Sequence, residues 1–562
     1  MAELVIRGGM VVDGTGRPAY RADVRVSGGR IVEIGDDVGS AGARPLDAGG
    51  AVVAPGFIDS HTHLDPSMFW DPLCDPMPQH GVTTALVGNC SLGLVPVRPE
   101  LVSGVTDVFC YIEDMPPAAF DDGIPWSWET FDQYRDVIDG MGVSLHTAVL
   151  IGHTPLRMYV MGEDAWTRAA TEAELAEMTA VLDASMTAGA FGFSTSTFDE
   201  DSRSRPVPSR LADDAEMRAL LEVTARHGGV VEFIPGLGSP NAAPDLRRFG
   251  GLCIETGATC VVNGIVHHST RKIHELMMPV VRELRSNGAS VWPLISPRTV
   301  DLRINWERSM MFMKMPKGWH RVPNAADDAE RRRLLTDPAW RAAAREEWDE
   351  VDTGFFPVRD LKRVRLVDVT RPEHERLLGH PMTDLVAERG GHPSDVLADW
   401  VLDNDLRPGV LCIGMANFDP DGVAELLADD DVLVSSSDAG AHVQMMCAAG
   451  DTTLLLTRHV RDRGDFTLEA AVHELTGKQA DVLGLRGRGT VAPGLAADLT
   501  VFALEELDWA DDVFVDDLPR GARRLRRPAG GYRYTVAAGE LTQEGGTLTG
   551  ARPAGVLHVG TG

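Results

Sequence analysis

The sequence is short of several features that would assign its class at once. No run of apolar residues approaches 18, so the sequence predicts no membrane span. Its seven cysteines are odd in number and scattered along 562 residues, which argues against a disulfide framework and for a reducing compartment. The first residues hold an acid, Glu3, and no long apolar core, so no signal peptide is expected. We therefore expect a cytoplasmic protein with no membrane partner.

Positive charge is also scarce. The chain has 53 Lys and Arg against 83 Asp and Glu, a formal net charge of −30. This balance disfavours a nucleic-acid partner and otherwise indicates a well-solvated acidic surface. Only five of the basic residues are lysines, so chemistry that depends on lysine has few positions available. The hydrophobic share of 44% and the charged share of 24% are typical of a folded globular protein.

The two ends of the chain share one pattern, in which short β-branched runs are separated by glycine turns. Such runs occur over the first fifty residues, as in Leu4–Ile6 and Arg30–Ile34, and return near the C-terminus, as in Tyr532–Val536. We interpret residues 1–54 and 485–562 as one small β-sandwich domain built from both termini.

Between residues 55 and 484, short apolar segments alternate with helical ones, which is typical of an α/β protein and favours a (β/α)8 TIM-like barrel. Expected helices include Glu172–Ala188, Asp213–His227 and Pro393–Asn404. Nine segments compete for eight strand positions, and either Ser290–Ile295 or Val410–Met415 is the extra one. The other candidates are Val52–His61, Thr84–Cys90, Ser144–Ile151, Ala190–Thr195, Val230–Ile234, Thr259–His267 and Val432–Asp438.

Residues 301–391 interrupt this alternation. They contain a segment rich in Met and Trp, Trp306–Trp319, followed by a charged, helix-like stretch over residues 327–350. A long insertion after a barrel strand commonly forms a lid or an oligomer contact. Alternatively, the methionines pack a small core that belongs to the insertion itself.

The strongest local signal for chemistry is a His-x-His pair, His61 and His63, after the lead-in Pro55-Gly-Phe-Ile-Asp59. Residues two apart on a strand point the same way, so both imidazoles would face one point at the end of a barrel strand. Two neutral imidazoles in that position are a natural cradle for a divalent transition metal.

With its context, this pair gives the sequence a resemblance to the amidohydrolase superfamily. The resemblance covers nearly the whole chain, from the opening Ile6–Thr15 through the His-x-His strand to the closing Arg488–Leu499. Within the superfamily the sequence is most similar to the D-aminoacylases (N-acyl-D-amino-acid deacylases), through the segments Gly81–Cys90, Ile151–Arg157, Met186–Thr195 and Ser437–Asp438. The family fold is a (β/α)8 barrel with a β-sandwich made from both termini, which agrees with our interpretation of the chain ends.

The resemblance implies a site for one or two zinc ions, or for another divalent transition metal. A cysteine at the position of Cys90 is a zinc ligand in the family, in place of the carbamylated lysine of many relatives. No lysine of this chain lies at an expected strand end near residue 195. A thiolate beside imidazoles suits Zn²⁺. The alternative for Cys90 is a small buried side chain with no ligand role.

Asp438, at the end of the last expected strand, is the expected catalytic carboxylate. It would take a proton from a metal-bound water and later give one to the leaving amine. The alternative is a turn cap before Ala439. His442 follows within reach of the same barrel mouth and is a candidate substrate-binding residue.

The sequence also departs from the family pattern. The family supplies histidine ligands from the fifth and sixth strands, but the fifth strand here has Glu232, either as an oxygen ligand or as a structural or substrate-facing acid. The sixth offers His267 as a ligand, with Asn263 as the alternative. His153 and Arg157 follow the third strand and are expected either to contact substrate and support the site or to pack.

A second departure concerns the substrate carboxylate. The family places an arginine soon after the catalytic aspartate to hold it, whereas this chain reads His442-Val443-Gln444. Specificity for a free N-acyl amino acid is therefore in question.

The sequence predicts a metal-dependent amidohydrolase that cleaves the C–N bond of a linear amide on a modified D-amino acid or a related acylated amine. One alternative is a cyclic amide or urea hydrolase similar to hydantoinases. Another, from a different class, is a ligand-binding barrel with a degenerate metal site. The expected partners are a small-molecule amide and, on the resemblance, further copies of the chain in a homo-oligomer.

Overall fold

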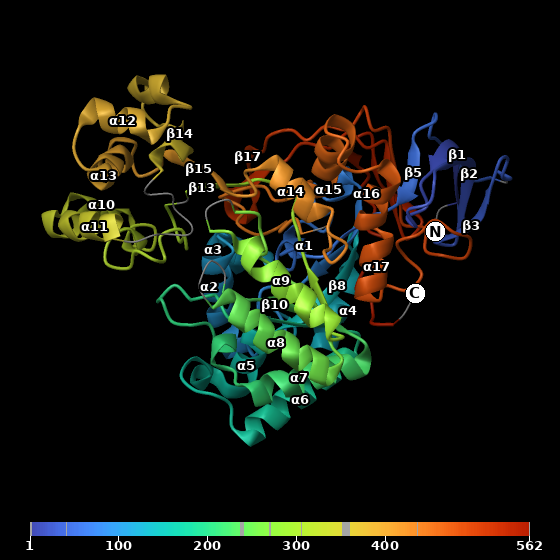
Figure 1. Ribbon diagram of the computed structural model, residues 1–562, viewed down its shortest axis with the longest axis horizontal. Coiled ribbons are helices and arrows are strands. Elements are labelled where there is room, and N and C mark those ends of the chain that lie inside the picture. Colours follow the sequence, from blue (N-terminus) through green and yellow to red (C-terminus); the bar gives the residue numbers. More distant parts are fainter. Residues whose placement is uncertain are drawn as a thin grey trace.

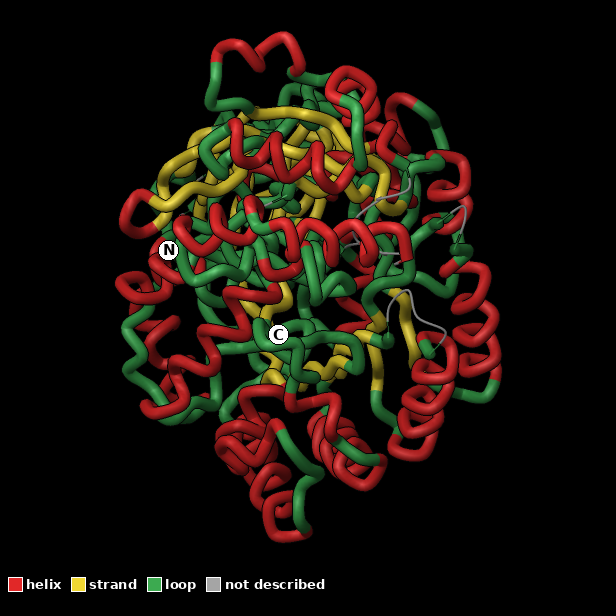
Figure 2. Tube along the Cα trace, turned by 90° about the vertical axis from the view of Figure 1, so that its left-hand side faces the viewer, coloured by secondary structure: helices red, strands yellow, loops and turns green. Residues whose placement is uncertain are grey.

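A curled parallel sheet lies in the middle of the molecule, with helices packed along its outer side (Figures 1 and 2). The computed structural model describes residues 3–40, 42–236, 241–268, 271–304, 306–350, 360–434 and 436–560. Neighbouring strands of the sheet follow each other in chain order, and all are paired in parallel. The strands are β6 (Phe57–Asp59), β7 (Val82–Val87), β8 (His146–Gly152), β9 (Gly192–Ser196), β10 (Val230–Ile234), β11 (Thr259–Val262) and β12 (Ser290–Pro293).

Helices connect these strands, and local sequence signals set their ends. Helix α6 (Glu172–Thr187) begins with a capping box between Thr171 and Glu174. Helix α7 (Asp214–His227) begins where the Asp213 side chain accepts from a backbone N–H, and it ends at Gly228, whose φ is +70°. These two expected helices are confirmed, as is α13 (Pro393–Asp403). The other helices that border the sheet are α4 (Phe131–Met141), α5 (His153–Met161), α8 (Ala242–Thr256) and α9 (Ile273–Ser286).

Residues 432–434 and 436–439 occupy the eighth strand position, between the two edges of the parallel sheet. Leu433 forms a parallel bridge with Leu294 beyond β12, and Ala439 forms one with Thr62 beyond β6. The α/β class is therefore confirmed, with the difference that the eighth position is joined to its neighbours by isolated bridges rather than by a continuous ladder. This arrangement matters for the site because Ala439 directly follows Asp438.

The extra strand candidate is Val410–Met415. It belongs to β15 (Gly409–Ala416), which pairs antiparallel with β13 (Val300–Arg303) and β14 (Val364–Asp368) in a separate sheet. This sheet and helices α10 (Asp328–Thr336), α11 (Pro338–Glu350), α12 (Met382–Arg389) and α13 project from the body in Figure 1. The inserted unit thus continues to Ala416.

The inserted unit has a hydrophobic core of its own. Five of its buried members are aromatic or sulfur-containing residues of the Met- and Trp-rich segment, Trp306, Met311, Phe312, Met315 and Trp319. Met310 and Met313 of the same segment instead join the core of the main body. The segment therefore contributes side chains to both hydrophobic cores, and most of them lie in the core of the insertion.

The two ends of the chain form a single nine-stranded sheet. Its core strands pair in the order β16, β5, β1 and β2, so that a C-terminal strand lies directly against an N-terminal one. The candidate Val52–His61 splits at Gly56: β5 belongs to this sheet and β6 to the parallel one. The strands are β1 (Leu4–Val11), β2 (Tyr20–Ser27), β3 (Arg30–Gly35), β4 (Arg44–Asp47), β5 (Val52–Pro55), β16 (Leu499–Phe502), β19 (Tyr534–Ala537), β20 (Glu540–Glu544) and β21 (Thr547–Leu548).

The remaining helices and strands are α1 (Ser67–Trp70), α2 (Val102–Ile112), α3 (Pro117–Gly123), α14 (Pro420–Leu427), α15 (Asp451–Leu454), α16 (Leu468–Leu475), α17 (Gly477–Leu483), β17 (Val513–Leu518) and β18 (Ala522–Arg526). Among the described residues, no helix is both long enough and apolar enough to cross a membrane.

Candidate active site

Parallel pairing between the ends of two segments sets His61 and His63 against Asp438. The amide N–H of Asp438 donates to the carbonyl of His61 at 3.0 Å, and the N–H of His63 donates to the carbonyl of Ala439 at 2.7 Å. The two imidazole centroids are 5.3 Å apart. Asp438 Oδ1 lies 3.5 Å from Nε2 of each ring. The His-x-His spacing therefore turns both rings to one carboxylate, as alternation along a strand requires.

Cys90 reaches the same point through a tight turn after β7. Gly88 has a φ of +80°, and a Cβ there would lie 2.2 Å from the carbonyl oxygen of Leu150, so only glycine allows β8 to approach. The Asn89 side chain then ties the turn to the carbonyls of Thr62 and Leu86, each at 2.9 Å. Cys90 Sγ comes within 3.4 Å of His61 Nε2. The Gly-Asn-Cys run thus places a sulfur beside the imidazoles.

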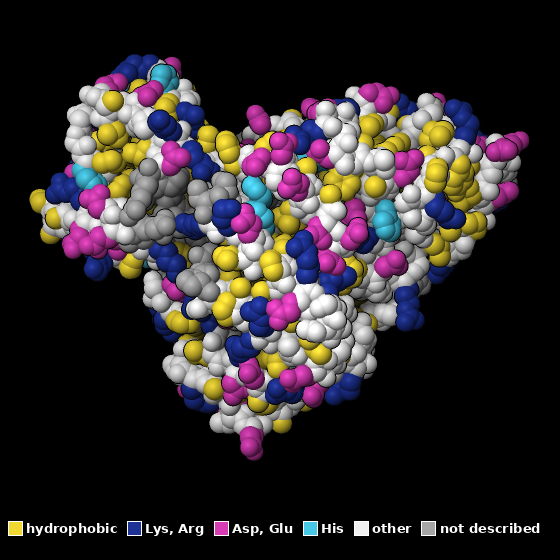
Figure 3. Space-filling view, viewed as in Figure 1, with side chains coloured by type: hydrophobic (Ala, Val, Ile, Leu, Met, Phe, Trp, Pro, Cys, Tyr) yellow, Lys and Arg dark blue, Asp and Glu magenta, His cyan; other side chains and the backbone are white. Residues whose placement is uncertain are grey.

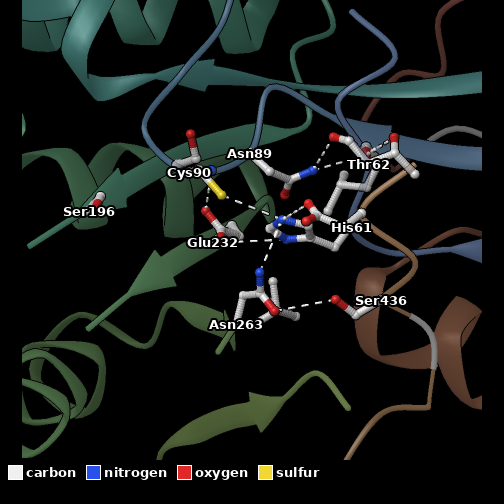
Figure 4. Close-up of polar contacts among 12 residues, drawn as sticks. His61, Thr62, Asn89, Cys90, Ser196, Glu232, Asn263 and Ser436 are labelled. Carbon is white, nitrogen blue, oxygen red and sulfur yellow. Dashed lines mark hydrogen bonds and ion pairs between the residues drawn. The ribbon is translucent and has the colours of Figure 1, made fainter. Parts of the chain in front are cut away.

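Two further side chains converge on His61 from neighbouring strands (Figure 4). Glu232 of β10 accepts from the Cys90 amide at 2.8 Å through Oε2, while its Oε1 lies 3.6 Å from His61 Nδ1. Asn263, which directly follows β11, places Nδ2 3.1 Å from His61 Nε2 and accepts from Ser436 Oγ at 3.2 Å. Both residues that replace the expected histidines therefore face the cluster.

The acidic groups of the site have pKa values outside their usual ranges, because they are buried and lie close to other charged or polar groups. Burial raises the pKa of Glu232 to about 7. Burial also raises the pKa of the Cys90 thiol, and the Glu232 and Glu113 carboxylates raise it further. Burial acts on Asp438 in the same direction, but the hydrogen bond with His61 and the imidazoles of His63 and His442 outweigh it and hold its pKa below the usual range. Asp438 is therefore ionised at neutral pH.

Glu113, at the end of α2, is a site residue that sequence reasoning missed. Its carboxylate is 2% exposed and lies 3.4 Å from His63 Nδ1 and 3.9 Å from His442 Nε2. It belongs to the long connection between β7 and β8, where no strand-end pattern marks it. His442 itself is near the cluster as expected, with Nε2 3.9 Å from Asp438 Oδ2.

His267 lies apart from the cluster. Strand β11 ends at Val262, and the segment that follows turns the His267 ring against Gly422 of α14 and to within 4.4 Å of the His274 ring centroid. Its backbone N–H donates to Asn417 Oδ1 at 2.8 Å, which fixes this course. The expectation that His267 is the sixth-strand ligand is therefore corrected, and Asn263 takes that place beside His61.

His153 and Arg157 are buried and hold a shared carboxylate. His153 Nε2 lies 2.8 Å from Glu216 Oε1, and Arg157 Nη1 donates to the same oxygen at 2.6 Å. Both side chains are fully enclosed. This placement agrees with a packing role and not with substrate contact, because Glu216 on α7 already binds His153 Nε2 and Arg157 Nη1.

The donor set fits a soft or borderline divalent metal. One ligand atom from each of His61, His63 and Cys90 lies within 4.8 Å of the others. His63 Nε2, which faces Asp438 Oδ1, is buried and has no hydrogen-bond partner among the described residues. A buried polar atom without a partner is costly, and a cation between these donors would satisfy it. Imidazole and thiolate are the ligands that zinc prefers.

A family comparison agrees with this geometry. The model of the Amidohydrolase family matches residues 45–543. The chain belongs to the amidohydrolase family. It is a hydrolase that acts on carbon–nitrogen bonds other than peptide bonds.

Known relatives share the full length of this amidohydrolase. It is 30% identical to an uncharacterised Mycobacterium tuberculosis protein, over 97% of this chain and 91% of the relative. It is 28% identical to the D-aminoacylase of Alcaligenes xylosoxydans xylosoxydans, over 96% and 95% respectively. A structure of the N-acyl-D-glutamate deacylase from Bordetella bronchiseptica, complexed with zinc and a phosphonate inhibitor, superposes with a TM-score of 0.68 at 24% identity. That superposition covers 99% of each chain and shows a shared fold.

Proposed function

We propose that this amidohydrolase is a zinc-dependent deacylase that hydrolyses the C–N bond of a linear acylated amine, as N-acyl-D-amino-acid deacylases do. The observation that carries the proposal is the position of Asp438 Oδ1, 3.5 Å from Nε2 of both His61 and His63 and beside Cys90. The 28% identity to a D-aminoacylase over nearly the whole chain supports the same class of reaction.

His61, His63, Cys90 and Asp438 would hold the metal. When bound, zinc supplies a Lewis acid that polarises an amide carbonyl and lowers the pKa of water towards about 7. Asn263 can present its oxygen to the same point if its side-chain amide rotates by 180° about the Cβ–Cγ bond. Glu232 contacts the far edge of the His61 ring and the Cys90 amide, so we assign it to holding two of the donors in place.

Asp438 has the properties of the proton carrier. Its low pKa keeps it ionised at neutral pH, so it can accept a proton from the attacking water. Its side chain is 24% exposed, whereas the rings of His61 and His63 are enclosed, so it borders the space a substrate would fill. The carboxyl group that results can then protonate the departing nitrogen. His442, 3.9 Å from Asp438 Oδ2, orients the second oxygen.

Metal analysis tests this proposal. We expect protein expressed in zinc-replete medium to hold about one zinc per chain and to lose activity on chelation and regain it on zinc addition. Cys90→Ala should lower zinc occupancy severely, whereas Cys260→Ala, which removes another enclosed thiol on β11, should leave it unchanged. The substrate panel should include linear N-acyl amines and cyclic amides. Metal-free protein that hydrolyses them as fast as zinc-loaded protein would refute the proposal.

A further inference from the structure

Helix α2 lies over His63 and presents two residues to it. Phe109 and Glu113 are four residues apart, so they share one face at the end of the helix. The Phe109 ring meets the His63 ring edge-on at a centroid distance of 6.2 Å. Glu113 Oε1 lies 3.4 Å from His63 Nδ1. One helix therefore both covers the imidazole ring and places a carboxylate at its edge.

Glu113 is also tied to the loop that follows Asp438. The backbone carbonyl of Glu113 accepts from the His442 amide at 2.6 Å, and its Oε2 lies 3.9 Å from His442 Nε2. Its carboxylate is enclosed and does not face open space. These contacts fix the position of Glu113 relative to the metal donors and leave it no direct access to a substrate.

The two histidines of the His-x-His pair have matching surroundings. His61 has Glu232 Oε1 3.6 Å from Nδ1 and Asp438 Oδ1 3.5 Å from Nε2. His63 has Glu113 Oε1 at 3.4 Å from Nδ1 and the same Asp438 oxygen at 3.5 Å from Nε2. Each ring thus turns Nε2 to the common point and Nδ1 to a buried carboxylate of its own.

We propose that Glu113 is a positioning residue for His63, and this inference rests on the proposed function. A neutral imidazole carries hydrogen on one nitrogen only, and a carboxylate beside Nδ1 favours hydrogen there. Nε2 of His63 is then free to bind a metal, and the ring is held in the orientation that the site needs. Such partners of metal-ligating histidines change metal affinity without touching the metal or the substrate.

The test measures zinc affinity in the full-length protein by competition with a chromophoric chelator at fixed pH. We expect Glu113→Leu, which has no acceptor, to weaken zinc binding by about 10- to 100-fold. Glu113→Gln keeps an acceptor oxygen and should weaken it less. In cobalt-substituted protein, the visible absorption bands should shift in both variants, because the ligand field at His63 changes.

Glu216→Gln is the matched control. Glu216 is equally buried and also lies beside an imidazole, 2.8 Å from His153 Nε2, but outside the cluster. Its substitution should leave both zinc affinity and the cobalt spectrum unchanged. Glu113 variants that bind zinc as tightly as the unchanged chain, with the same cobalt spectrum, would overturn the inference. An unchanged chain that binds no zinc would instead refute the proposed function.

Discussion

At the scale of single residues, three members of the site have backbone conformations that non-glycine residues adopt rarely. Cys90, Asp438 and His442 have φ values of +58°, +65° and +50°. Such conformations cost on the order of 1–3 kcal/mol each and persist only where neighbours hold them. Here each backbone N–H is bound: to Glu232 Oε2, to the carbonyl of His61 and to the carbonyl of Glu113, respectively. These contacts hold three residues of the site in conformations that would otherwise be unfavourable.

Asp438→Asn separates a catalytic role from a turn cap. Asparagine has nearly the same size and tolerates a positive φ, but it cannot accept a proton. We expect kcat to fall by roughly 100-fold or more, with little change in the thermal midpoint. Zinc content should be measured on the same preparations, so that loss of activity can be assigned to proton transfer rather than to loss of metal. An Asn variant with full activity would assign Asp438 to the turn alone.

At the scale of elements, the sequence predicts those parts of the site that follow regular strands. Apolar runs indicate β6 and β10, so the sequence places His61 and His63 just beyond one strand and Glu232 within the other, where the structure has them. Strand β11 shows the limit, because it ends five residues before His267, and the hydrogen bond that the His267 N–H donates to distant Asn417 sets the path beyond it. That bond joins segments 150 residues apart, and no local pattern could have indicated it.

Glu113 shows a different limit. Its place depends on which face of α2 packs on the barrel mouth, and this face is chosen by Phe109 and by the bond to the His442 amide. An acid at the end of a helix is otherwise an ordinary solvated residue. The signal that could have found it is its spacing of four from Phe109 on an apolar helix face, and that signal is weak without the fold.

The inserted unit should unfold as an element with its own stability. Trp319 is fully buried there, 5.4 Å from the Phe312 ring and 5.3 Å from the Trp340 ring, and its Nε1 donates to Ser394 Oγ at 2.8 Å. Trp319→Ala should lower the unfolding free energy of the insertion by about 3–5 kcal/mol. Calorimetry should then show a separate low-temperature transition, because the insertion core is distinct from the barrel core.

Phe131→Ala on α4 is the control for this experiment. Phe131 is equally buried but lies in the core of the main body. Its substitution should lower the main transition and leave the insertion transition in place. A single transition that moves as a whole in both variants would contradict independent stability of the insertion.

At the scale of the whole molecule, the acidic balance is spread over the surface and does not form one dominant patch on the face shown in Figure 3, where acidic and basic side chains alternate. Many of them are paired in exposed salt bridges, each of which contributes little to stability. The acidic groups that matter for function lie inside the site, where Glu113, Glu232 and Asp438 surround the imidazoles, and burial raises the pKa of both Glu113 and Glu232. An anionic substrate gains no long-range attraction from such a distribution.

Two of the buried arginines, Arg157 and Arg298, are already engaged. Arg157 binds Glu216, and Arg298 donates to Asp451 Oδ1 at 3.0 Å and to the carbonyl of Ser437 at 2.8 Å. Gln444, in the stretch after Asp438 where the resemblance leads us to expect an arginine, places its Nε2 3.5 Å from the carbonyl of Asp114. A substrate carboxylate left without a partner in a partly desolvated site costs about 1–3 kcal/mol.

We therefore expect this amidohydrolase to prefer an uncharged acyl amide over a free N-acyl-D-amino acid. The unpaired carboxylate corresponds to a loss of roughly 10- to 100-fold in kcat/KM, at about 1.4 kcal/mol per factor of ten. The measurement is a panel that pairs N-acetyl-D-amino acids with their carboxamides and with bulkier acyl amides, all with zinc-loaded protein. Because an acid and its own carboxamide differ only in the charged group, the ratio of their kcat/KM values reports that group alone. A tenfold preference for the free acids would show that another cation binds the carboxylate. Arg458→Ala would then be the first variant to test, because Arg458 Nη1 donates a long hydrogen bond, 3.3 Å, to the carbonyl of Pro297.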